Sequence, residues 1–85
     1  GGIKIKNDPS MDLAICMSLA SGYFNKPVSS KTVVFGEVGL LGEIRGVVLQ
    51  EKRIKEAKRL GFSKFATSDN FDFLQKGIKE VFKNS

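Results

Sequence analysis

The chain has 85 residues and a mass of 9.3 kDa, which allows one small domain. It contains no histidine and one cysteine, Cys16, which excludes an intramolecular disulfide, a histidine-ligated metal and Ser-His-Asp or Cys-His catalysis. The net charge is +5, and the stretch from Arg45 to Lys64 carries all of it, because seven bases there accompany two acids. No apolar run could span a bilayer and the N-terminus is no signal peptide, so we expect a cytoplasmic protein without membrane partners.

The spacing of apolar residues predicts an α/β (α+β, two-layer) domain over residues 1–85, in the order β-α-β-β-α-β-α. Asp8 and Pro9 are typical of a helix start, Gly61 is suited to end a helix, and Ser68 with Asp69 can cap the last one. The predicted elements are a strand over 1–6, a helix over 9–24, strands over 32–38 and 43–49, a helix over 51–60, a strand over 62–67 and a helix over 70–83.

The first predicted helix is apolar on nearly all sides. Its two apolar faces consist of Leu13, Met17, Ala20 and Phe24 on one side and of Met11, Ile15 and Leu19 on another. Such a helix needs cover on more than one side, and 85 residues can barely supply it. The sequence therefore predicts further chain or a partner against this helix.

Several stretches resemble one protein family when they are read together. They are DPSMDLA at 8–14, NKPV at 25–28, TVVFGEVGLLGEIR at 32–45 and EKRIKEAKRLGF at 51–62. In this order and spacing, residues 1–67 resemble the C-terminal, Lon-protease-like domain of RadA-type bacterial DNA-repair proteins, also called Sms. The resemblance implies a Lon proteolytic-domain-like fold (ribosomal protein S5 domain 2-like), with this chain forming the C-terminal half of that domain.

The resemblance also implies properties of a larger protein. RadA-type proteins combine an N-terminal four-cysteine zinc finger, a RecA-like DNA-dependent ATPase and the Lon-like domain, and they form hexameric rings on DNA. This chain has neither a Walker A loop nor a C-x-x-C pair, so ATP, Mg and Zn are expected only in the other modules. The implied partners are duplex or branched DNA, bound without sequence preference, and further copies of the same protein.

Ser10 raises the question of peptidase activity, because it matches the nucleophile position of Lon proteases. Their general base is a lysine near the start of the next helix, and that position falls on Glu51 here, with Lys52 as the neighbouring candidate. Asp8 and Asp12 flank the serine and add negative charge where an oxyanion must be stabilised. We therefore expect no catalytic residue, and a residual ATP-dependent Ser-Lys peptidase using Ser10 and Lys52 is the alternative.

The excess charge concentrates on the second predicted helix. At about 100° per residue, one face of this helix carries Lys52, Lys55 and Arg59, opposite the apolar face. Arg45 and Lys64 could extend this basic stripe, whereas Arg53 falls on the apolar side and has to reach outward. A phosphate backbone is the natural partner of such a stripe, and the other interpretation is an ordinary solvated helix face.

Three functions are consistent with these patterns. The first is a non-proteolytic Lon-like domain that contributes DNA binding and ring assembly to a RadA-type repair ATPase. The second is the residual peptidase, and the third is a purely architectural domain that drives oligomerisation. A RecA-like ATPase upstream in the native chain would favour the first, and an AAA+ module would favour Lon.

Overall fold

The computed structural model describes residues 8–83, so the strand predicted over 1–6 lies outside the described residues. The described part is an α+β domain with three α-helices and two small sheets. In chain order its elements are the 3-10 helix η1 (Pro9–Met11), α1 (Asp12–Phe24), β1 (Thr32–Val34), β2 (Glu37–Val38), β3 (Ile44–Arg45), α2 (Gln50–Arg59), β4 (Lys64–Ala66) and α3 (Leu74–Val81). Within this described part, no helix has both the length and the apolar character that a membrane crossing requires.

The strand predicted over 32–38 is in fact two strands in different sheets, so that prediction is wrong. The chain leaves the first sheet at Gly36, whose N–H donates to the carbonyl of Ser10 at 3.0 Å. The Gly36 carbonyl in turn accepts from the N–H of Leu13 at 3.0 Å, at the start of α1. A Cβ at Gly36 would lie 3.2 Å from side-chain atoms of both Leu13 and Ile44, which explains the glycine at this break.

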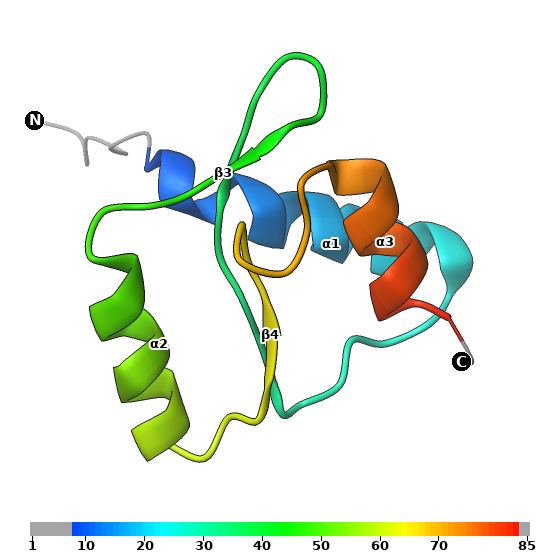
Figure 1. Ribbon diagram of the computed structural model, residues 1–85. Coiled ribbons are helices and arrows are strands. Elements are labelled where there is room, and N and C mark those ends of the chain that lie inside the picture. The colour runs from blue at the N-terminus through cyan, green and yellow to red at the C-terminus, as the bar shows by residue number, and fades with distance from the viewer. Residues whose placement is uncertain (1–7, 84–85) are drawn as a thin grey trace, which may run out of the picture.

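The two sheets differ in direction and in how their strands are connected. β1 pairs in parallel with β4, with Val33 opposite Phe65, and α2 lies on the connection between them. β2 and β3 form an antiparallel hairpin in which only Ile44 and Arg45 of the predicted second strand are paired. Figure 1 shows α1 crossing the middle of the molecule, with α3 beside it and α2 set apart on the other side of the strands.

The hydrophobic core lies between α1, α3 and the hairpin. Its fully or nearly buried members come from three separate parts of the chain and are Leu13, Met17, Ile44 and Phe82. Gly77 of α3 lets the two helices approach, since a Cβ there would lie 3.2 Å from Cε of Met17. Phe71, just before α3, and Leu74, Ile78 and Val81 within it pack against this core.

One face of α1 packs into the core and the opposite face is exposed. Leu13 and Met17 are buried, whereas Ile15, Leu19 and Tyr23 are 55%, 71% and 85% exposed. The spacing of four residues places these three side chains in one stripe along the helix. The prediction that α1 is apolar on more than one side is confirmed, and within residues 8–83 this stripe stays uncovered.

The last helix is shorter than predicted, and its predicted cap is wrong. α3 begins at Leu74 rather than at 70, because the side chain of Asn70 accepts hydrogen bonds from the backbone and hydroxyl of Thr67 instead. These hydrogen bonds fix a turn after β4. The predicted cap residue Ser68 instead accepts a hydrogen bond at its hydroxyl from the Gln50 side chain. The N–H of Leu74 donates to the carbonyl of Gly42 at 2.7 Å, so the hairpin loop satisfies the start of α3.

Candidate nucleic-acid interface

Hydrogen bonds of Gln50 anchor the start of α2, and Gly61 ends the helix. At the first end, the Gln50 side chain accepts from the N–H of Val47 at 3.0 Å and donates to the Ser68 hydroxyl at 2.9 Å. At the last end, the N–H of Gly61 bonds the carbonyl of Lys58, and Gly61 has φ +99°, as the sequence predicts for a helix terminator. Between the ends Ala57 alone among the α2 residues is buried, so nearly the whole helix surface faces outward.

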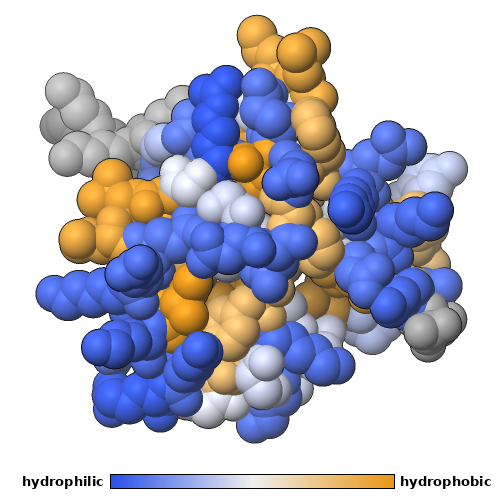
Figure 2. Space-filling model, viewed as in Figure 1, coloured by the Kyte–Doolittle hydropathy of each residue, from blue (hydrophilic) through white to orange (hydrophobic). Residues whose placement is uncertain are grey.

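The basic stripe predicted on this helix is present as an exposed face. Lys52, Lys55 and Arg59 are all exposed, and their spacing of three and four residues places them along one side of α2. Within the described residues, Lys52 and Lys55 take part in no salt bridge, so their full charge is presented to a ligand. Figure 2 shows hydrophilic side chains crowding this end of the molecule.

Arg59 differs from the two lysines because it is paired. Its guanidinium donates two hydrogen bonds to the Glu56 carboxylate one turn earlier, one of them 3.1 Å long from Nε. The pair raises the pKa of Arg59 and lowers the pKa of Glu56, since each charge stabilises the other. Arg59 therefore stays charged, but its guanidinium has to exchange a carboxylate for any phosphate that it binds.

The two predicted extensions of the stripe lie on other elements. Arg45 belongs to the hairpin and its guanidinium lies 3.3 Å from Glu43 and 3.9 Å from Glu37, so its charge is shared with two carboxylates. Lys64 is exposed at the start of β4, where its N–H donates to the carbonyl of Lys31 at 3.1 Å. The structure therefore places Arg45 in an ion-pair cluster and brings Lys64 beside Lys31, a base that sequence reasoning did not single out.

Two further bases of α2 have surroundings that sequence reasoning missed. Lys58 places its Nζ 5.8 Å from the centre of the Phe65 ring, within the range of a cation–π contact. Arg53 lines a groove with Lys52 and is close enough to the Asp8 carboxylate to help lower its pKa. Helical spacing within α2 does not reveal these neighbours, because Phe65 and Asp8 lie outside this helix.

Ser10 is nearly buried, and its hydroxyl donates to the Asp8 carboxylate at 2.7 Å. The Ser10 N–H donates to the same oxygen at 3.0 Å, so Asp8 caps the helix start as predicted. These two hydrogen bonds are the main reason why the pKa of Asp8 lies below its usual value, and the charge of Arg53 adds to them. Within residues 8–83 the Ser10 hydroxyl has no lysine partner, while Glu51 and Lys52 are exposed on α2.

The sequence is similar to those of several DNA repair proteins. It is 44% identical to the DNA repair protein RadA of Rickettsia felis over 98% of this chain, and 50% identical to that of Rickettsia bellii over 95%. It is also 46% identical to the DNA repair protein RadA of Streptococcus pyogenes over 82% of this chain. The chain belongs to the RadA family. No family model matches the chain.

The chain spans only part of the length of its RadA relatives. It covers 20% of the Rickettsia felis protein, 18% of the Rickettsia bellii protein and 15% of the Streptococcus pyogenes protein. The α2 face is thus a surface on a segment of RadA, and most of each relative lies outside the matched region. Among the described residues of this RadA segment, acidic and cysteine side chains form no group able to hold a metal ion.

Proposed function

We propose that this chain is the Lon-protease-like C-terminal domain of a RadA-type DNA-repair ATPase, to which it contributes DNA binding and ring assembly. Membership of the RadA family supports the repair role. One observation carries the DNA-binding part, namely the exposure of Lys52 and Lys55 on one face of α2 without salt bridges in the described region. Two ammonium groups in this state give a phosphate backbone a place to bind.

The proposed contact is with phosphates and not with bases. Lysine ammonium groups recognise phosphates as point charges, and helix α2 places no aromatic side chain between its bases on which an unpaired base could stack. Duplex or branched DNA would therefore bind without sequence preference and with affinity that falls as salt rises. In this proposal Arg59 binds a phosphate after its guanidinium releases the Glu56 carboxylate. Arg45 and Lys64 lie at the edge of the DNA-binding face.

The remaining parts of the proposed machine lie in other modules. The zinc finger and the RecA-like ATPase would hold Zn, ATP and Mg, and the present sequence lacks the motifs that bind these groups. The complete protein would act on DNA in the cytoplasm as a hexameric ring. In this proposal the Lon-like domain supplies a surface rather than a reaction.

In this function Ser10 has a structural role. Its hydroxyl donates to an ionised carboxylate whose lowered pKa makes it a poor proton acceptor at neutral pH. The same negative charge opposes the oxyanion that an acyl transfer would form near Ser10. The geometry of Asp8 and Ser10 is that of a helix cap, which favours the non-proteolytic domain over the Ser-Lys peptidase.

A charge-reversal pair in the full-length protein tests the DNA-binding role. K52E/K55E should weaken duplex binding at least tenfold at about 0.1 M salt and lower the slope of log K against log salt by roughly 2. K76E/K79E is the matched control, because Lys76 and Lys79 have the same spacing on exposed positions of α3 and the change in net charge is identical. Equal losses in the two variants would show that only the overall charge matters and would refute the site.

A further inference from the structure

The tip of the β2–β3 hairpin exposes two leucines on a well-ordered turn. Leu40 is fully exposed and Leu41 is 85% exposed. The turn around them is fixed, since the N–H of Gly39 donates to the Glu43 carbonyl at 2.9 Å and the N–H of Leu41 donates to the Glu43 carboxylate at 3.1 Å. Figure 2 shows a hydrophobic protrusion at the top of the view, where Figure 1 places this hairpin.

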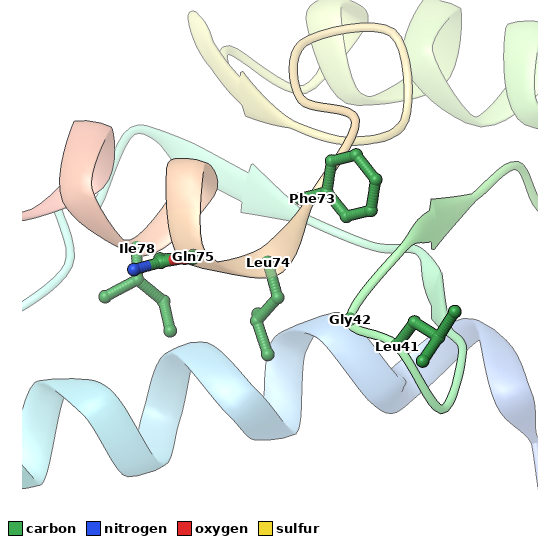
Figure 3. A pocket seen from close by; sticks show the side chains of 6 residues that line it. All are labelled: Leu41, Gly42, Phe73, Leu74, Gln75 and Ile78. Carbon is green, nitrogen blue, oxygen red and sulfur yellow. The ribbon is translucent and has the colours of Figure 1, made fainter.

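The neighbouring elements hold the hairpin in place but do not cover its tip. A hollow of about 390 Å³ separates the tip from the start of α3. In Figure 3, Leu74 points toward α1 across this hollow, whereas Leu41 extends from the hairpin loop away from Phe73. The two leucines lose almost no water contact on folding, so they contribute little to this fold and are suited to an external partner.

The charges around the hairpin are mainly negative. Glu37 and Glu43 share the single guanidinium of Arg45, and two more carboxylates, those of Asp12 and Asp72, belong to residues hydrogen-bonded to the hairpin backbone. This surface therefore repels DNA phosphates and anionic lipid headgroups. Its partner has to be an apolar protein surface with a positive rim.

A surface of that kind exists on the α2 side of the same molecule. A groove of about 430 Å³ between α2 and β1 has a mostly apolar lining, formed by Val33, Leu49, Ala57, Leu60 and Phe62. Leu49 and Leu60 are 64% and 63% exposed at its edges. Lys52 and Arg53 also line the groove, and the one acid there, Glu56, is already paired with Arg59.

We propose that the hairpin tip of one chain inserts Leu40 and Leu41 into the α2–β1 groove of a second copy. The leucines match the apolar lining, and the acidic surroundings of the tip match the positive rim formed by Lys52 and Arg53. Because the two surfaces differ, the contact is head-to-tail and leaves a free groove at one end of a pair and a free tip at the other. Repetition of such a contact closes a ring or extends a filament, and this inference rests on the proposed ring assembly.

Photo-crosslinking in the full-length protein locates the partner of the tip. Benzoylphenylalanine replaces Leu40 in an unlabelled copy, which is mixed and reassembled with a nitrogen-15-labelled copy that lacks the probe. The expected product joins position 40 of the unlabelled copy to labelled peptides that contain Val33 or come from residues 49–62, because these line the groove. Cross-links that stay within one copy, or that reach other segments of the labelled copy, would overturn the proposal.

Charge substitutions at the tip and in the groove then test how much this contact contributes to self-association, which is measured by sedimentation in the absence of DNA. L40K/L41K should weaken self-association at least tenfold, because two ammonium groups meet the positive rim, and L40M/L41M should assemble like the wild type. Adding R53E to L40K/L41K should restore at least part of the assembly. Unchanged association of L40K/L41K, or no rescue by R53E, would overturn the inference. A wild type that does not self-associate would instead overturn the proposed ring assembly.

Discussion

Helices α1 and α2 have opposite relations to the rest of the domain. α1 buries Leu13 and Met17 in the core and meets the hairpin and α3, whereas α2 buries only Ala57 and contributes no residue to the core cluster. The first helix is fixed along its length by packing, and the second is anchored by hydrogen bonds of Gln50 at its start. α1 therefore holds the fold together, whereas α2 is free to carry charged side chains.

The strongest test of this comparison is a deletion of core volume in α1. Leu13→Ala should lower the free energy of unfolding by about 3 kcal/mol, because the fully buried side chain leaves a cavity. Leu19→Ala in the same helix should change it by less than about 0.5 kcal/mol, since Leu19 is 71% exposed. Urea denaturation of this chain measures both values, and equal losses would show that the exposed face of α1 also packs.

Gly22 in α1 and Gly36 against it should respond in opposite ways to substitution by alanine. Gly36→Ala should destabilise by about 2 kcal/mol, because its Cβ would press against Leu13 and Ile44 at 3.2 Å. Gly22→Ala should stabilise by about 0.5–1 kcal/mol, since no atom lies within 4 Å of its Cβ and alanine favours the helix. Thermal unfolding of the two variants should shift in opposite directions. Shifts of the same sign would contradict the packing around Gly36.

A smaller loss than that of Gly36→Ala is expected at the anchored end of α2. Gln50→Ala removes the acceptor of the Val47 N–H and the donor to Ser68, which should cost about 1 kcal/mol. Hydrogen exchange should become faster in α2 and stay unchanged in α1, because α2 lies outside the core. Glu51→Gln is the control at the next, exposed position. Faster exchange throughout the domain would mean that α2 supports the core after all.

Local patterns predicted the helices better than the strands. Helix periodicity located α1 and α2 to within a few residues, and Gly61 ended α2 as expected, because these signals act within one or two turns. The break at Gly36 depends on hydrogen bonds to Ser10 and Leu13, and the late start of α3 depends on Gly42 and Asn70. Such partners are distant in sequence or compete with a local cap, so apolar spacing could not reveal them.

The candidate site, like the fold, was predictable where local spacing decides and not where contacts between distant residues decide. Helical spacing was sufficient to place Lys52, Lys55 and Arg59 on one exposed face. The same spacing places Glu56 three residues before Arg59, where a helical ion pair is expected. The pairing of Arg45 with Glu37 depends instead on the path of the hairpin, which spacing could not reveal. A count of charges therefore gives these bases equal weight, although they differ in how readily they can bind a phosphate.

The parallel pairing of β1 with β4 has a mechanical consequence. The pairing of Thr32 with Lys64 closes a loop that contains both the hairpin and α2. A ligand pulling on α2 therefore loads the chain at two points, through Gln50 at one end and through Lys64 at the other. The first load reaches Ser68, just after β4, through the Gln50 side chain, and the second reaches the start of β4 along the chain. Tension on the charged helix is thereby delivered to both ends of β4, in the body of the domain.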